Sequence, residues 1–262
     1  MKRHSYSWSG ARRKMKLRLQ LRAMAILLVL NGLIALRRQT TILISISLSP
    51  FTFIYFLYLV SPRAELPYGI VGAIVFTTVF TGNMMLNDAA YARLERHLQA
   101  LYVASPVRAF SYATGIAISE LVFIVPPLAV LFAVLSLVVH LTAAVFLSLL
   151  GIIFMTWVMS SSLGFMISSF FRQLREIWPI ASLVFSVISI IPPIFYPITA
   201  IPAGVRWIAY IAPTTYSALL ADSVVGITRV STQTQFFYVA GLLVATLIFM
   251  GIAAAFTRWR EK

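Results

Sequence analysis

The chain has no cysteine, and it has only seven acidic residues and four lysines among its 262 residues. The absence of cysteine excludes disulfide bonds, thiolate metal sites and a cysteine nucleophile. The lysines stand at positions 2, 14, 16 and 262, and no G-x-x-x-x-G-K-S/T sequence occurs. The chain therefore has no phosphate-binding loop of the kind that holds a nucleotide.

Histidine is equally scarce, with His4, His97 and His140 as its only positions. None of the three falls inside a predicted membrane span, where a Ser–His hydrolase would need one beside its nucleophile. Too few histidines and carboxylates could converge to hold a metal ion. We therefore expect this chain not to be an enzyme, and to bind no metal and no cofactor of its own.

The sequence does contain long apolar runs. Hydrophobic residues make up 60% of the chain and charged residues 11%, whereas a soluble domain is about half apolar and a quarter charged. About 20 apolar residues in a helix cross a bilayer, and in lipid the backbone must be hydrogen-bonded internally. The sequence predicts an all-α membrane protein with six spans, at 41–60, 68–86, 113–138, 143–167, 178–196 and 236–257.

The positive charges orient these spans. Of the 21 lysines and arginines, 18 lie before the first span, in the connections 87–112 and 168–177, or after the last span. Because positive residues stay on the cytoplasmic side, both termini are predicted to be cytoplasmic in a multi-pass protein of the cell membrane. The net charge of +14 lies at the edges of the apolar runs, so we expect no nucleic-acid partner.

Residues 1–40 are predicted to form a basic cytoplasmic tail and an interfacial amphipathic helix, ahead of a six-helix transmembrane domain at 41–262. The apolar stretch Ala23–Leu36 has 14 residues. As a helix it is about 21 Å long, which is short for a hydrocarbon core of about 30 Å. We expect it to lie along the inner membrane face. A seventh crossing is the alternative, and it would place the eight basic residues that precede Ala23 outside.

The connection between the second and third spans contains the sequence LERHLQALYVASPVR, from Leu94 to Arg108. Its apolar residues recur at helical spacing on one face: Tyr91, Leu94, Leu98 and Leu101. Ser105-Pro106 ends the helix, because proline disfavours helix at the residue before it. The sequence predicts a short cytoplasmic helix whose apolar stripe lies on the membrane or the bundle mouth, or contacts a cytoplasmic partner.

The stretch from Ile191 to Val224 follows the fifth span and contains five prolines. Prolines break helices, so this stretch cannot be one straight span, while its apolar and aromatic residues do not suit an aqueous loop. Short re-entrant helices in the outer leaflet are predicted. They either form a gate over the bundle or only anchor its outer surface.

These two stretches resemble the ABC-2 type transporter permeases and are similar to the drug-resistance, daunorubicin-type members. The first matches the family's Glu, leucines and Ser-Pro, with Arg96-His97 where Gly-Thr is usual. The second follows the order of its Tyr-Pro, Ile-Pro, aromatic run and Asn-Pro-Leu-Thr, where this chain has Pro213-Thr214-Thr215, with Ala212 in place of the Asn. The matching residues are Glu95, Leu98, Leu101, Ser105, Pro106, Val107, Tyr196, Pro197, Ile201, Pro202, Trp207, Ile208 and Pro213–Tyr216.

The resemblance implies the permease subunit of an ABC exporter for a hydrophobic or amphipathic drug, lipid or glycan-linked cargo. The implied partners are a separate ABC ATPase in two copies, which binds ATP and Mg, a second permease chain in a homodimer or heterodimer, and membrane lipid. An ATP-independent carrier or channel is one alternative, and a membrane scaffold subunit is another.

The resemblance also assigns two groups of site residues. An ATPase-coupling helix would use Tyr91, Leu94, Glu95, Arg96, Leu98, Leu101, Ser105 and Pro106. An outer gate would use Tyr196, Pro197, Pro202, Trp207 and Pro213.

Glu120 is the only ionisable residue well inside a predicted span. A charge in lipid is costly and normally faces a cavity or a partner. Glu120 is therefore either a polar contact in the translocation path or dimer seam, or a carboxyl that is protonated or reaches the inner interface. Small residues also gather at Ser160–Phe170. They let helices approach closely, so we interpret them first as packing residues and second as a dimer or substrate seam.

Overall fold

The computed structural model describes residues 17–38, 40–60, 66–95 and 107–256, and these ranges contain helices but no strand. The N-terminal helix Leu17–Arg38 includes a π-helical turn. The elements are η1 (Leu28–Ile34), α2 (Ala35–Arg38), α3 (Thr40–Val60), α4 (Leu66–Leu94), α6 (Ala109–Val138), α7 (Ala143–Ser168), α8 (Leu174–Ile190), η3 (Ile198–Ala200), η4 (Ala203–Val205), α9 (Arg206–Ala209), α10 (Pro213–Val225) and α11 (Thr232–Phe256).

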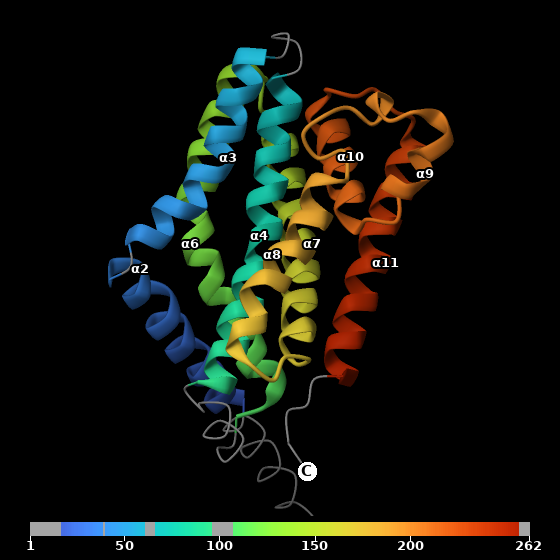
Figure 1. The fold of residues 1–262 in the computed structure, drawn as a ribbon. Coiled ribbons are helices and arrows are strands. Elements are labelled where there is room, and N and C mark those ends of the chain that lie inside the picture. Colours follow the sequence, from blue (N-terminus) through green and yellow to red (C-terminus); the bar gives the residue numbers. More distant parts are fainter. Residues whose placement is uncertain (1–16, 39, 61–65, 96–106, 257–262) are drawn as a thin grey trace, which may run out of the picture.

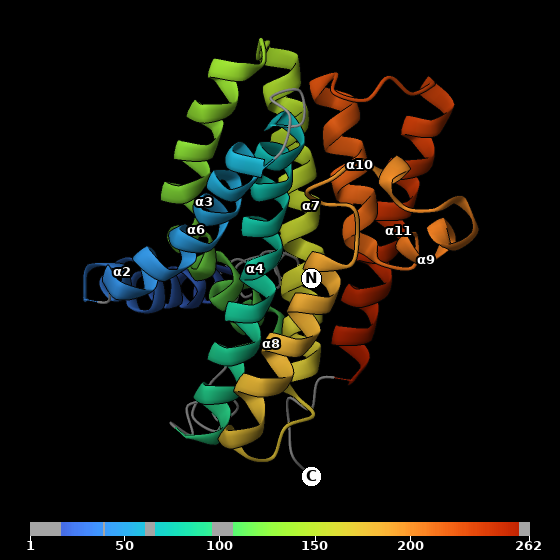
Figure 2. The ribbon, with the colours of Figure 1, turned by 45° about the horizontal axis from the view of Figure 1, so that its top comes forward.

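The long helices form one bundle (Figure 1). The end of α4, the start of α6, the α7–α8 turn and the end of α11 all lie at its lower end, which we call the basal end. The elements η3, η4 and α9 lie at the opposite, upper end. The N-terminal helix starts at the basal end and crosses obliquely beside α6, as Figures 1 and 2 both show.

Each of the six predicted spans contains a helix, but several predicted boundaries are wrong. The helices α6, α8 and α11 each begin four residues earlier than predicted, and the ends of α4 and α8 are farther off. The helix α4 runs on to Leu94 instead of ending at 86, so Tyr91 and Leu94 belong to its last turns and do not begin a separate helix. The helix α8 covers Leu174–Ile190, and a series of bends replaces the predicted helix at 191–196. Pro192 and Pro193 account for this, because a proline has no amide hydrogen to continue the helix.

Within the described ranges, five helices are long and apolar enough to cross a membrane: the N-terminal helix, α4, α6, α7 and α11. The chain is thus an all-helical, multi-pass membrane protein. The helices α3 and α8 are not among the five, so the count of six crossings stays a prediction. The interfacial position of the N-terminal helix also stays a prediction.

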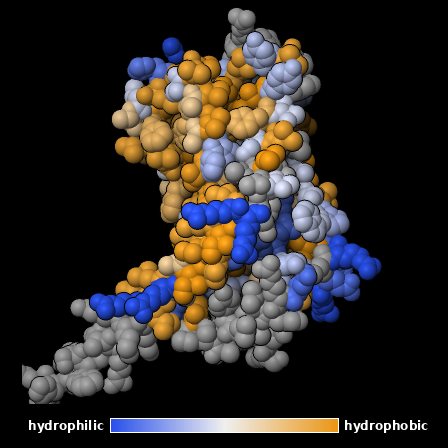
Figure 3. Space-filling model, turned by 90° about the vertical axis from the view of Figure 1, so that its left-hand side faces the viewer, coloured by the Kyte–Doolittle hydropathy of each residue, from blue (hydrophilic) through white to orange (hydrophobic). Residues whose placement is uncertain are grey.

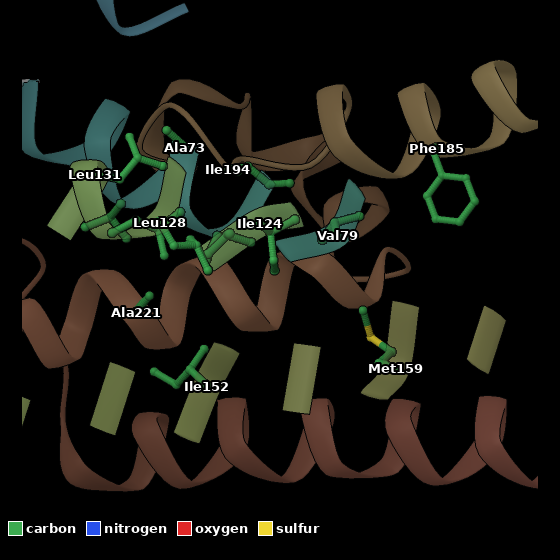
Figure 4. Close-up of a cluster of buried hydrophobic side chains, with 14 of the residues drawn as sticks. Ala73, Val79, Ile124, Leu128, Leu131, Ile152, Met159, Phe185, Ile194 and Ala221 are labelled. Carbon is green, nitrogen blue, oxygen red and sulfur yellow. The ribbon is translucent and has the colours of Figure 1, made fainter. Parts of the chain in front are cut away.

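The helix α4 lies at the centre of the bundle. In the most apolar 18 residues of α4, 78% of the residues are buried, whereas the corresponding share is 33% in α6 and α7 and 22% in α11. Buried side chains of α4 form one core with those of four other helices and of the bend after α8 (Figure 4): Ala73, Val79, Ile124, Leu128, Leu131, Ile152, Met159, Phe185, Ile194 and Ala221.

Glycines set the distance between α4 and α7. A Cβ atom on Gly164 would overlap the carbonyl oxygen of Gly82, and one on Gly82 would overlap the carbonyl oxygen of Ser160. The hydroxyl groups of Thr81 and Ser160 lie 3.1 Å apart across the same contact. The two backbones therefore touch, and Ser160 and Gly164 act within the chain as the packing residues that the sequence predicted.

The N-terminal helix packs against α6 in the same manner. Leu27 is buried, and its side chain fills the space that a Cβ on Gly115 would need. Gly32, in the π-helical turn, lies against the backbone of Ser119. One side of this helix is thus attached to the bundle, and the other side is exposed.

Hydropathy is unevenly distributed over the surface. On the face drawn in Figure 3, hydrophobic residues cover much of the upper part, and most of the strongly hydrophilic residues gather lower down. The exposed apolar area suits contact with lipid chains, which solvate apolar side chains.

Candidate functional site

The basal end contains a joint between α4 and α7 that is built on Arg93. Arg93 lies in the last turn of α4. Its Nη1 donates to the carbonyl oxygen of Ser169 at 3.0 Å, and its Nη2 donates to that of Ser168 at 2.7 Å. Nη2 also donates to the carbonyl oxygen of Phe171. One guanidinium group thus holds three carbonyl groups, and we call this the Arg93 joint.

The chemistry of a helix end explains this joint. The last carbonyl groups of a helix have no amide partner within the helix, and they carry its negative dipole end. Ser168 is the last residue of α7, and Ser169 is its C-cap. The half-buried guanidinium of Arg93 satisfies the carbonyls and compensates their negative charge. The end of α7 is therefore attached to the end of α4.

Three of the predicted ATPase-coupling residues are described by the structure, Tyr91, Leu94 and Glu95, and they lie next to this joint. Tyr91 is 39% exposed, whereas Leu94 is half-buried and packs against the main core. The amide of Glu95 donates to the carbonyl oxygen of Tyr91 at 3.0 Å, which extends the last turn of α4. Outside the described residues lie Arg96, Leu98, Leu101, Ser105 and Pro106. Their role as a coupling helix stays a prediction.

The other end of the α4–α6 connection is attached to the N-terminal helix. The amide of Arg108, which precedes α6, donates to Oε1 of Gln20 at 3.0 Å. The carbonyl oxygen of Arg108 accepts from the amide of Tyr112 at 3.0 Å and so begins α6. The connection between α4 and α6 is therefore held at one end through Arg93 and at the other through Gln20.

Glu120 is enclosed within the chain. Its side chain is 1% exposed, and neither carboxyl oxygen has a hydrogen-bond partner among the described residues. The carboxyl of Asp88, on α4, interacts with it electrostatically. One turn before it, the carbonyl oxygen of Ala117 accepts a hydrogen bond from Nε1 of Trp157 at 3.1 Å. Glu120 thus faces the interior between helices of one chain, and its role in transport stays a prediction.

The predicted outer-gate stretch is a chain of short helices and bends. Proline begins three of its elements: Pro197 is the N-cap of η3, Pro202 is the N-cap of η4, and Pro213 is the first residue of α10. The Tyr196 hydroxyl donates to the carbonyl oxygen of Ile191 at 2.8 Å, which closes the bend after α8. Trp207 is 63% exposed.

This stretch is also attached to the core. A Cβ on Gly72, in α4, would overlap the carbonyl oxygen of Ile194, whose own side chain is 1% exposed. The Thr214 hydroxyl donates to the carbonyl oxygen of Ile188, in α8, at 2.5 Å. The stretch therefore packs into the bundle near its upper end and is not a free loop. Its function as a gate stays a prediction.

A groove with a volume of about 320 Å³ lies between the upper parts of α7, α10 and α11. Its lining is mostly apolar, with Gly151, Leu220 and Phe236 among its residues and Gln235 as one of few polar members. A Cβ on Gly151 would meet no atom within 4 Å. The groove is thus open on the side of α7 that faces away from α4.

Sequence reasoning missed two residues that the structure makes prominent. Arg93 could have been noticed as a basic residue near a helix end, but its partners lie more than 70 positions later in the chain. Asp222, in α10, is 1% exposed, and its Oδ1 has no hydrogen-bond partner among the described residues. A lone carboxylate in the apolar run SALLADSVV was the available signal.

Five apolar helices of membrane-crossing length among the described residues define a multi-pass membrane protein. The family model of the ABC-2 type transporter matches residues 22–221, which include the Arg93 joint and most of the outer stretch. The chain belongs to the ABC-2 type transporter family, and it is a membrane permease of an ABC-type transporter. Members of this family normally work with an ABC ATPase and form dimers. No curated protein matches the chain.

Proposed function

We propose that the chain is the permease subunit of an ABC exporter whose ATP and Mg are bound by a separate ATPase present in two copies. A second permease chain, identical or related, completes the transporter. The protein lies in the cell membrane with its basal end in the cytoplasm, and both termini are on that side. The position of Arg93, Arg108, Arg172 and Arg175 at basal ends of helices supports this orientation, because positive residues stay cytoplasmic.

The observation that carries the proposal is the Arg93 joint. A force applied to the segment that follows Leu94 acts first on the last turn of α4. Through Arg93 it then acts on the end of α7 and on the turn that leads into α8. The close backbone contact between Gly82 and Gly164 makes the two helices move together farther up the bundle. This arrangement suits a permease that is driven from its cytoplasmic side.

The groove between α7, α10 and α11 supports a hydrophobic or amphipathic cargo. Sites for small molecules are mostly apolar clefts of about 300–1,000 Å³ with a few polar groups. A volume of about 320 Å³ with an apolar lining and Gln235 at its margin fits the lower end of that range. A drug, a lipid chain or a glycan-linked lipid would match this lining, whereas a strongly polar cargo would lose its hydration there.

The first test is association with an ABC ATPase. The full chain is co-expressed with an ABC ATPase subunit, and the complex is purified through a tag on the permease. The double variant Leu98→Asp and Leu101→Asp is expected to lose the ATPase, because two charges would lie in the predicted contact. The control Ile211→Asp changes a side chain that is 69% exposed at the opposite end, and it should retain the ATPase. Full retention by the double variant would contradict the contact.

The second test separates the exporter from its alternatives. The purified complex is reconstituted in proteoliposomes and screened for apolar compounds that stimulate ATP hydrolysis and accumulate in an ATP-dependent manner. Equal accumulation without the ATPase would indicate an ATP-independent carrier or channel. If the chain binds the ATPase but no compound is transported and none stimulates ATP hydrolysis, the chain would be a scaffold subunit.

A further inference from the structure

The N-terminal helix Leu17–Arg38 has arginines at both ends and no acidic residue near them in the sequence. Residues 1–64 contain no Asp or Glu. Arg18 and Arg22 lie in the first part of the helix, and Arg37 and Arg38 end it. All four side chains are exposed. Among the described residues, no hydrogen bond or ion pair engages any of the four guanidinium groups.

The spacing of these arginines favours an external anion. Arg18 and Arg22 are four residues apart, so their side chains lie on the same face of the helix and repel each other. Arg37 and Arg38 are adjacent at the point where the chain turns into α3. An anion bound at either pair would relieve the repulsion. Neighbouring basal elements add positive charge, because the exposed Arg108 is attached by its amide to Gln20.

The surface between the two pairs is apolar. One side of the helix is buried on α6 through Leu27 and Gly32. The other side exposes large apolar side chains: Leu21 55%, Ile26 56%, Val29 43%, Leu30 51% and Leu33 48%. Arg22 and Arg37 are about 22 Å apart along the helix, at about 1.5 Å per residue. A helix with basic residues beside an apolar face is suited to a membrane surface with anionic headgroups.

We propose that this exposed side of the N-terminal helix binds acidic phospholipids, with the phosphate headgroups on the two arginine pairs and the chains on the apolar face. A soluble phosphate or a nucleic acid would match the charges but would leave the apolar side chains in water. A zwitterionic lipid would cover the apolar face but would carry no net negative charge for the arginines. Only an acidic lipid fits both parts. This inference does not depend on the proposed transport function.

The test uses the full chain in nanodiscs of equimolar phosphatidylcholine and phosphatidylglycerol, released into a native mass spectrometer. The wild-type chain is expected to retain phosphatidylglycerol in excess over phosphatidylcholine. The variant Arg18→Gln, Arg22→Gln, Arg37→Gln and Arg38→Gln should lose this preference. Each arginine near an anionic surface contributes about 1 kcal/mol, or about fivefold in affinity. The matched variant with lysine at all four positions keeps the charge and should keep the preference.

Two further arms keep the result interpretable. The double glutamine variants at Arg18/Arg22 and at Arg37/Arg38 are measured separately. Each double variant should lower the preference for phosphatidylglycerol in part. A quadruple variant that fails to fold therefore does not end the test. Arg229→Gln, at the opposite end, should not change it. An unchanged preference in both double variants would overturn the proposal. So would displacement of the lipid by excess inorganic phosphate, since that result would indicate a site for a soluble anion.

Discussion

The contact between Gly82 and Gly164 predicts a pair of matched substitutions in one helix. The helix α7 contains two glycines with opposite surroundings. A Cβ on Gly164 would overlap the backbone carbonyl of Gly82, whereas a Cβ on Gly151 would meet no atom within 4 Å. Gly164→Ala should therefore destabilise the protein, and Gly151→Ala should not.

The size of the effect follows from what must move. The obstacle at Gly164 is backbone, which cannot rotate away, so α4 and α7 must separate. Overpacking of this kind costs about 1–3 kcal/mol. Alanine in place of glycine within a helix also gains about 0.5–1 kcal/mol, and this gain applies to both variants. The difference between the two variants therefore isolates the steric cost of about 1–3 kcal/mol.

The assay is thermal unfolding of both variants in the same detergent or nanodisc, followed by circular dichroism or by the fluorescence of the tryptophans. For a domain of this size, about 1 kcal/mol corresponds to about 2–4 °C. Gly164→Ala is thus expected to melt about 2–12 °C below Gly151→Ala. Equal melting temperatures would refute the close backbone contact between α4 and α7, and so would a lower value for Gly151→Ala.

Three other substitutions test other contacts. Arg93→Met removes the three hydrogen bonds to the end of α7, so the amount of cargo transported per ATP hydrolysed in proteoliposomes should fall. Arg93→Lys should give an intermediate value. Equal values for the wild type, Arg93→Met and Arg93→Lys would contradict the joint. Gly72→Ala places a methyl group against the carbonyl of Ile194 and should lower the free energy of unfolding by about 1–3 kcal/mol. The measurements are the melting temperature, which should fall, and the rate of proteolysis of the outer stretch, which should rise. Glu120→Gln keeps the shape of an enclosed side chain beside Asp88, so its melting temperature should stay within about 4 °C of wild type. A larger drop would show that the carboxyl group itself is needed.

The helices were predictable because their signals are local. An apolar run of about 20 residues must form a helix in lipid, whatever it packs against. The bends after α8 were also expected, since Pro192 and Pro193 cannot donate to a helix. The error at that point concerned only where the helix ends. The extension of α4 to Leu94 was missed because the polar residues after 86 were taken as the end of a span.

The candidate site was only partly predictable. The resemblance drew attention to the stretch after Tyr91, and the family is confirmed. The residue that attaches this stretch to α7 was not identified, because Arg93 looks like any basic residue at a cytoplasmic helix end. Glu120 was noticed as an ionisable residue in an apolar run, but its enclosure between α6 and α4 could not be inferred from its own helix.

The amino-acid sequence by itself determined that this protein is helical and apolar, with most of its positive charge outside the apolar runs. These properties depend on composition and on runs of neighbouring residues, which act the same way in any packing. The tertiary structure alone decided that Gly82 meets Gly164, that Ile194 lies on Gly72 and that Arg93 holds the end of α7. Each of these contacts joins segments far apart in the chain, and in lipid it is close backbone packing, rather than burial of apolar surface, that selects between possible helix pairs.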